Sequence, residues 1–210
     1  MSCAVKLLAY CVARDAVPRL PPTGVRGAPI HTMNVGALWC AYSPLVPPQE
    51  FTREDALSFH SVLRAAFEQQ AIIPFRFPTI LQNESELQVH LRDKHLPYLA
   101  DLERLKDAVQ MELRIAGKPE VASAATGKEY LRSKQLRSHA LQAESEKART
   151  ALGGLVLEWK ERAADQGLRC YALIKRDGVA SFRQILETAF SSPSAVLLSG
   201  PWPATEFLHD

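Results

Sequence analysis

The residues that could carry out chemistry in this chain do not fall in the spacing that a known reaction needs. The stretch 126–128 reads Thr-Gly-Lys and is similar to the end of a phosphate-binding loop. Such a loop also needs a glycine five positions before Gly127 and a Ser or Thr after Lys128, because it holds phosphates and magnesium. Ala122 and Glu129 stand at those positions. A helix start therefore explains this stretch better than nucleotide binding.

Metal-binding and nucleophilic patterns are also missing from the sequence. His90 and His95 are five residues apart, which places them on different faces of a helix, and no HExxH or Cys/His quartet occurs. There is no GxSxG nucleophile elbow. We therefore predict no catalytic residue, no metal and no cofactor. The cysteines form no CxxC pair and are typical of free thiols in a reducing cytoplasm: Cys3, Cys11, Cys40 and Cys170.

Length and charge narrow the class of protein. The chain has 210 residues, which suits one large domain or two small ones. Its net charge of +2 is too small to indicate a nucleic-acid-binding protein. No apolar run approaches the ~20 residues that a membrane-spanning helix needs. Lys6 interrupts the first apolar run, so we expect no signal peptide.

The most distinctive segment is residues 71–81, which read AIIPFRFPTIL. Its β-branched and aromatic residues predict a strand, and alternation would place Ile73, Phe75 and Phe77 on one face. Pro74 and Pro78 cannot donate hydrogen bonds to a neighbouring strand, so an edge, a bulge or a strand end is expected.

Three features of the sequence could contact a partner protein. Arg76 is a charge inside an apolar segment; either it pairs with a carboxylate or strand-end carbonyls, or it contacts an acidic group on a partner. Trp202 lies between two prolines and either closes the core or shapes a docking surface. The third feature is a basic cluster that forms a solvated helix face or a docking patch: Lys128, Arg132, Lys134 and Arg137.

The first half of the chain predicts the order strand, strand, helix, strand, helix, strand. Strands are expected at residues 4–13, 31–42, 71–81 and 108–116. Thr52 with Asp55 and Asn83 with Glu86 are helix-capping signatures before the two helices. The second helix extends to about Leu105, and Pro97 should kink or split it. This order indicates a ferredoxin-like antiparallel sheet covered by two helices, over residues 1–117.

The second half predicts a smaller α+β domain over residues 118–210. A long helix is expected at about residues 128–164, weakened in its middle by Gly153 and Gly154. Strands at residues 168–175 and 194–199 flank a short helix that Ser181 would cap. Asp177-Gly178 could instead form a hairpin turn. The fold class is therefore α+β in both halves.

Three stretches of the chain resemble the gas vesicle protein F/L family. They are IIPFRFPT at 72–79, TGKEYL at 126–131 and SGPWP at 199–203. The family carries a PxRFGT strand, a GxxYL helix entry and a terminal GPWPPYxF in this order. Pro78 replaces the family's glycine, and residues 204–207 read ATEF in place of the Pro-Tyr-x-Phe ending.

This resemblance implies a two-domain α+β protein without catalytic residues. It implies an accessory or minor structural component of gas vesicles that acts in the cytoplasm with the small hydrophobic shell protein and other accessory proteins. Two alternatives remain open at this point: a stoichiometric component of the vesicle wall, or a general protein-interaction module. An enzyme on a ferredoxin-like scaffold is a third class, because that fold hosts many activities.

Overall fold

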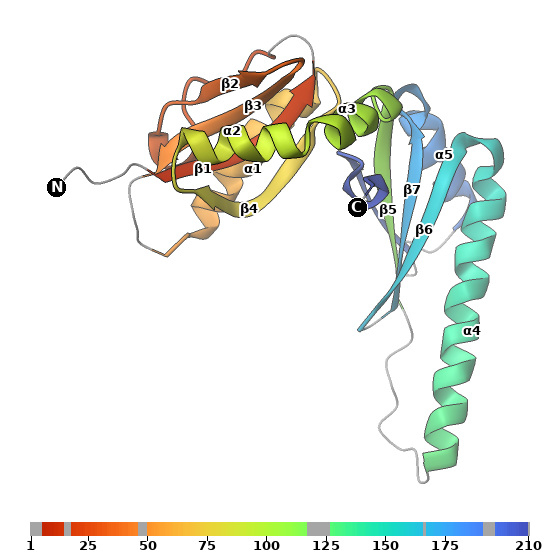
Figure 1. The fold of residues 1–210 in the computed structure, drawn as a ribbon. Coiled ribbons are helices and arrows are strands. Elements are labelled where there is room, and N and C mark those ends of the chain that lie inside the picture. Colours follow the sequence, from red (N-terminus) through yellow and green to blue (C-terminus); the bar gives the residue numbers. More distant parts are fainter. Residues whose placement is uncertain are drawn as a thin grey trace. The chain divides into compact units, whose positions relative to one another are not determined.

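The chain forms two compact units in a computed structural model (Figure 1). The structure describes residues 6–14, 18–45, 50–116, 127–165, 167–190 and 196–209. The N-terminal unit comprises Met1–Asp107 with Leu208–Asp210, and the C-terminal unit comprises Ala108–Phe207. The C-terminal unit is thus inserted near the end of the N-terminal one.

The sheet of the N-terminal unit contains four strands in the order β2-β3-β1-β4. They are β1 (Lys6–Arg14), β2 (His31–Val35), β3 (Leu38–Leu45) and β4 (Ile73–Leu81). Both β3 and β4 pair antiparallel with β1, so β3 and β4 run parallel to each other with β1 between them. Helix α1 (Arg53–Phe67) connects these two strands. The result is the split β-α-β unit typical of ferredoxin-like folds.

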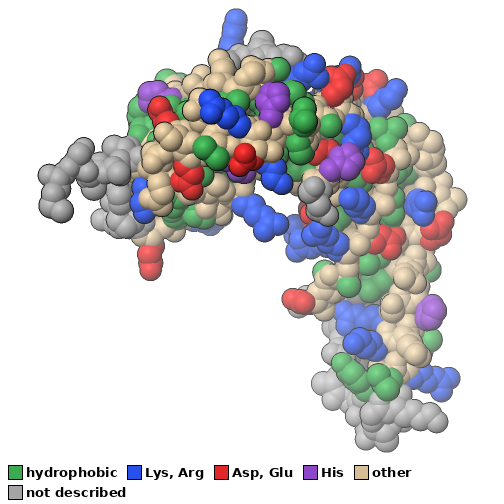
Figure 2. Space-filling view, in the orientation of Figure 1, with side chains coloured by type: hydrophobic (Ala, Val, Ile, Leu, Met, Phe, Trp, Pro, Cys, Tyr) green, Lys and Arg blue, Asp and Glu red, His purple; other side chains and the backbone are tan. Residues whose placement is uncertain are grey.

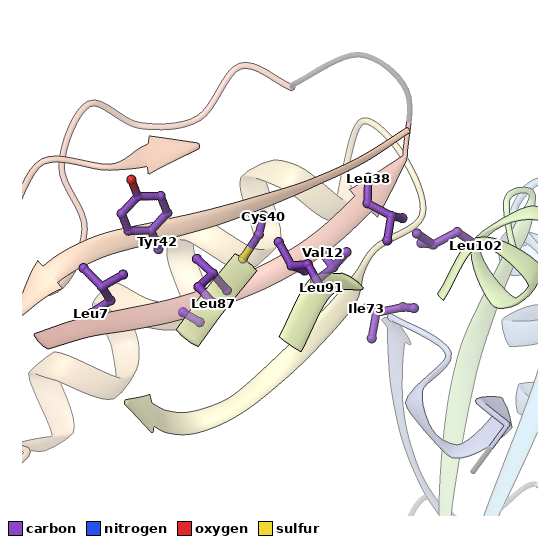
Figure 3. Packing of buried hydrophobic residues seen from close by; sticks show 10 residues of the cluster. Leu7, Val12, Leu38, Cys40, Tyr42, Ile73, Leu87, Leu91 and Leu102 are labelled. Carbon is purple, nitrogen blue, oxygen red and sulfur yellow. The ribbon is translucent and has the colours of Figure 1, made fainter. Parts of the chain in front are cut away.

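Helices cover both faces of this sheet (Figure 1). Helix α1 lies on one face, where Phe59 stacks on Tyr10 of β1 with ring centroids 5.1 Å apart. Helices α2 (Glu84–Asp93) and α3 (His95–Arg104) lie on the other face. There, Leu87 and Leu91 are fully buried in the cluster that Figure 3 shows. Strands β1 and β3 are consequently buried on both sides, which explains their near-continuous apolar sequences.

The capping box expected before α1 is present and is reinforced by an arginine from a distant loop. Thr52 and Asp55 bond reciprocally, with the Asp55 amide donating to Thr52 Oγ1 at 3.2 Å. Arg26 donates to both carboxylate oxygens of Asp55, from Nη2 at 2.8 Å and Nε at 3.1 Å. The Arg26 hydrogen bonds, followed by that from the Thr52 backbone, lower the pKa of the Asp55 carboxyl. The ionised form of Asp55 is therefore favoured by folding.

This cluster predicts a pH dependence of stability. Because the pKa of Asp55 is lower in the folded protein, the stability that its ionised form contributes is fully present above the ordinary value of 3.8. It is lost as the pH falls through the folded-state pKa. We expect Asp55→Asn to lower stability at neutral pH and to flatten its decline below about pH 4. Urea unfolding at several pH values measures this, with exposed Glu54→Gln as the control. Equal acid sensitivity of Asp55→Asn and wild type would contradict the assignment.

The C-terminal unit repeats the topology of the N-terminal one. Its strands are β5 (Ala108–Ala116), β6 (Val156–Ala164), β7 (Gly167–Lys175) and β8 (Val196–Trp202). They are arranged in the order β6-β7-β5-β8. Strands β7 and β8 both pair antiparallel with β5, and helix α5 (Val179–Ala189) connects them. The two orders are the same when β5, β6, β7 and β8 are matched in turn to β1, β2, β3 and β4.

The long helix and two of the expected strands differ from the sequence-based prediction. The strand at residues 108–116, expected to complete the first sheet, is β5 and pairs with β7 and β8 in the second. The strand predicted at 31–42 is a hairpin of β2 and β3, because Gly36 turns the chain at φ 60°. The helix predicted at about 128–164 is α4 (Gly127–Leu152); Gly153, at φ 49°, ends it, and β6 follows.

Of the other expectations, the Asn83 cap and the split near Pro97 are confirmed, whereas the Ser181 cap is not, because α5 begins at Val179 with Gly178 as its N-cap. The Asn83 side chain accepts a hydrogen bond from the Glu86 amide at 2.9 Å, as the capping signature predicts. The helix that Pro97 was expected to kink or split is divided into α2 and α3 at Lys94, and Pro97 lies in the first turn of α3. Asp177-Gly178 belongs to a short 3-10 turn that leads into α5, so the hairpin alternative is wrong. The α+β class is confirmed by two antiparallel sheets and five α-helices among the described residues.

Candidate interaction surfaces

Strand β4 is an edge of its sheet and is irregular in its middle. Ala9 of β1 pairs with Thr79 of β4, and Cys11 pairs with Pro74. The chain thus advances by two residues in β1 but by five residues in β4. The ladder is therefore interrupted across the centre of β4. Such bulges are common at sheet edges, where they redirect side chains.

The irregularity changes which face each aromatic residue of β4 occupies. Phe75 lies against His90 of α2, with ring centroids 5.5 Å apart. Phe77 lies against Phe59 of α1, at 5.0 Å. The two phenylalanines thus point to opposite faces of the sheet. The prediction that both line one face is wrong, because the extra residues in β4 break the alternation.

Arg76 lies between these phenylalanines and is exposed. Its backbone carbonyl accepts a hydrogen bond from Thr79 Oγ1 at 2.7 Å, which closes the local turn. Among the described residues, its guanidinium forms no salt bridge or hydrogen bond. Pairing of Arg76 with a carboxylate or with strand-end carbonyls, one of the two expectations, is therefore not observed in the described part of the chain. A contact between Arg76 and a partner stays a prediction.

Trp202 ends strand β8 opposite Gln110 of β5 and is half-buried. Its indole Nε1 donates to Ser199 Oγ at 3.3 Å. The chain then turns so that Ala204 and Phe207 are buried at 6% and 2% exposure. The half-buried indole beside these buried residues is typical of a tryptophan that closes a domain. A contact between Trp202 and a partner stays a prediction. Arg76 and Trp202 belong to different units.

The buried thiols are poorly suited to nucleophilic chemistry. Burial raises the pKa of Cys11 to about 12 and that of Cys170 to about 11, and it raises the pKa of Cys40 well above its usual value. The thiolate is the reactive form, so these three residues behave as small apolar side chains. Cys3 lies outside the described residues.

His90 has a hydrogen-bonding partner within the N-terminal unit. The His90 ring nitrogen Nε2 is 3.0 Å from the Tyr98 hydroxyl, and burial lowers the pKa of His90. The described part of the chain contains no group of three or more His, Cys, Asp or Glu residues that could hold a metal ion.

The described residues line open hollows beside both sheets. The first, of about 420 Å³, lies beside Tyr42 and the start of α2. There Tyr42 donates to Glu84 Oε1 at 2.6 Å, and burial, ahead of this hydrogen bond, raises the pKa of Tyr42 to about 12. The second, of about 450 Å³, lies between the end of α4 and β6, beside Arg149 and Trp159. The first hollow is also lined by His31, whose ring centroid lies 5.7 Å from that of Tyr42.

Basic residues gather at two places on the C-terminal unit. Arg132, Lys134 and Arg137 lie on the N-terminal half of α4, where Figure 2 shows Lys and Arg side chains. The side chain of Lys128 is outside the described residues. The second group, Arg114, Arg162 and Arg169, lies on three neighbouring strands. The sequence analysis did not identify this group, because pairing of distant strands brings it together.

None of the helices in the described ranges is both long and apolar enough to cross a lipid bilayer.

Comparison with known proteins identifies the family. The model of the gas vesicle synthesis protein GvpL/GvpF family matches residues 6–209, so the chain belongs to this family and is a gas vesicle-related protein. No curated protein sequence matches it significantly.

Solved structures show the same fold. The crystal structure of gas vesicle protein GvpF from Anabaena sp. PCC7120 is similar with a TM-score of 0.79 at 15% identity, covering 98% of this chain and 97% of that one. GvpF from Microcystis aeruginosa gives 0.79 at 14% identity, covering 97% and 98%. The resemblance inferred from the three sequence motifs is confirmed.

Proposed function

We propose that this protein is an accessory or minor structural component of gas vesicles that assists assembly by binding the hydrophobic shell protein. Its partners would be the shell protein and other gas vesicle accessory proteins, and it would act in the cytoplasm at the vesicle. Membership of the GvpL/GvpF family supports this proposal. The buried thiols, with raised pKa values, and His90, which lies 3.0 Å from the Tyr98 hydroxyl, support binding in preference to catalysis.

The single structural observation that carries the proposal is the interrupted edge strand β4. An edge strand with unpaired backbone groups can accept a strand from another chain, and side-chain pockets then give specificity. In this proposal, strand β4 pairs with a strand edge of the hydrophobic shell subunit and protects it from aggregation before it is incorporated. Pro74 and Pro78 flank the irregular segment and remove two amide donors. They would limit this contact to a short segment around exposed Arg76.

Arg76→Ala tests this surface directly. Because the Arg76 side chain is exposed and has no salt bridge among the described residues, we expect the melting temperature to change by less than about 2 °C. Affinity for the shell protein should fall several-fold, as loss of a rim charge typically does. Arg92→Ala, at an exposed position on α2, is the matched control. A lowered melting temperature with unchanged affinity of the folded fraction would make Arg76 a structural residue.

Vesicle purification and gene deletion separate this proposal from its two alternatives, a wall component and a general interaction module. A stoichiometric wall component stays with purified vesicles after washing, whereas an assembly factor is recovered in small amounts or not at all. A general interaction module unconnected with gas vesicles leaves vesicle formation intact when its gene is deleted. We expect deletion to reduce or abolish vesicles.

A further inference from the structure

Among the described residues, one face of the sheet in the C-terminal unit has no α-helix over it. Helices α4 and α5 both lie on the opposite face (Figure 1), where Ser145 of α4 contacts Cys170 of β7 at 3.3 Å. On the face without a helix, the only described cover is the segment that follows β8. In this segment, the ring centroid of Phe207 lies 5.3 Å from Lys160 Nζ, and the Glu206 backbone amide donates a hydrogen bond to Gln110 Oε1 at 3.0 Å. We call this surface the open face.

Strand register places three arginines in one row on the open face. Arg169 of β7 lies directly opposite Arg162 of β6 on one side and Arg114 of β5 on the other. Directly opposed residues project to the same face of a sheet. Their side chains are 66%, 46% and 50% exposed for Arg162, Arg169 and Arg114. Because neighbouring strands are about 4.8 Å apart, the row extends over about 10 Å.

Such a row is unfavourable unless anions offset it, because like charges on opposed positions repel. Two carboxylates do so in part: Glu112 lies 2.8 Å from Arg114 Nε and 3.9 Å from Arg169 Nη1. Glu206 lies 2.7 Å from Arg162 Nη2. With Lys160 in the next row, four cations face these two anions. The surface therefore keeps an excess of positive charge; Glu158 lies one row further from the arginines.

The chain itself shows how an acidic segment binds to this face. Glu206 places its carboxylate on Arg162, and the adjacent Phe207 is buried at 2% exposure. An acidic residue next to an apolar one is thus accommodated at one end of the row. At the other end, Leu197 of β8 lies opposite Arg114 and is 61% exposed. An apolar contact is available there beside an arginine that is half exposed.

We propose that the row of Arg162, Arg169 and Arg114, with Leu197 at its end, binds an acidic amphipathic helix of a partner protein. The spacing favours a helix over a strand. Carboxylates at positions i and i+7 of a helix are about 10.5 Å apart, close to the length of the row, and those at i+3 or i+4 lie between them. Same-face residues of a strand repeat at about 6.7 Å and do not match. Planar guanidinium groups bind carboxylates with two parallel hydrogen bonds. This proposal does not depend on binding of the shell protein.

The test uses the full chain and a fluorescent Ala-based helical peptide of about 20 residues. The peptide carries Glu at i, i+3 and i+7 and a Leu beyond the last Glu. We expect it to bind, to bind more weakly as salt is added, and to lose affinity at least about tenfold with Arg162→Glu/Arg169→Glu. Arg132→Glu/Lys134→Glu on α4 makes the same charge change at exposed positions and should have little effect. Circular dichroism is used to check that each variant is folded. If the variant with both arginines reversed is unfolded, Arg169→Gln replaces it and should weaken binding several-fold.

The other outcomes overturn the proposal. Absence of peptide binding to the wild type removes it, as does equal loss with the α4 variant, which would indicate net charge alone. A peptide with the same composition but scattered Glu positions should bind more weakly, and equal binding would contradict the row geometry. Phosphatidylserine vesicles are the remaining probe. If they bind and the arginine variant abolishes this while peptide binding is absent, the face is a membrane-binding surface.

Discussion

Gly200→Ala is expected to destabilise the C-terminal unit by about 2–4 kcal/mol. Gly200 has φ 112°, in a region that residues with a side chain rarely adopt. A β-carbon there would lie 2.9 Å from the Gln110 carbonyl oxygen and 3.1 Å from the Met111 sulfur. The carbonyl is part of the β5 backbone and cannot move without disturbing the sheet. Backbone strain and steric overlap therefore add.

Chemical unfolding of Gly200→Ala, followed by the fluorescence of tryptophans in the C-terminal unit, measures this effect. Gly154→Ala is the matched control, because a β-carbon at Gly154 would have no atom within 4 Å and Gly154 has no positive φ. We expect the control to remain within about 0.5 kcal/mol of wild type. Equal stability of Gly200→Ala and Gly154→Ala would show that β5 and β8 are not packed as described.

Leu91→Ala is expected to destabilise the N-terminal unit by about 2–5 kcal/mol. Leu91 is fully buried between α2 and the sheet, in the cluster with Leu87 and Leu102 (Figure 3). Truncation removes buried apolar surface and leaves a cavity that the packed neighbours fill only in part. Leu96→Ala, at a position 77% exposed on α3, is the control and should change stability little.

The same variant tests how the units are divided. We propose that the N-terminal and C-terminal units are separate domains, with the boundary near Asp107 in place of residue 117. The C-terminal unit should then retain its amide-exchange protection when Leu91→Ala weakens the N-terminal unit. Loss of protection in both units at the same denaturant concentration would show one cooperative domain.

Local signals in the sequence predicted much of the fold. Capping residues such as Thr52 and Asn83 act within one turn, so their hydrogen bonds follow from sequence alone. The alternation in residues 108–116 and the apolar runs of the other strands depend only on which side chains are buried. The motifs at residues 72–79, 126–131 and 199–203 together were sufficient to predict the family.

Features that depend on distant pairing could not be predicted in this way. Strand β6 is rich in Glu, Lys and Arg because it is an exposed edge, and this composition is also typical of a helix surface. Residues 108–116 are a good strand in either sheet, so only tertiary pairing decides between them. The faces of Phe75 and Phe77 depend on extra residues opposite β1. The arginine row depends on the register of three strands that are separated in the sequence.

Direct binding to the gas vesicle shell protein is the measurement that tests the central proposal. The full-length chain is mixed with freshly solubilised shell protein, and the complex is captured and quantified beside an unrelated α+β protein of similar charge. We predict saturable binding that keeps the shell protein from aggregating and that Arg76→Ala weakens. A shell protein that remains unbound and aggregates at the same rate, with normal vesicles in a deletion strain, would contradict the proposal.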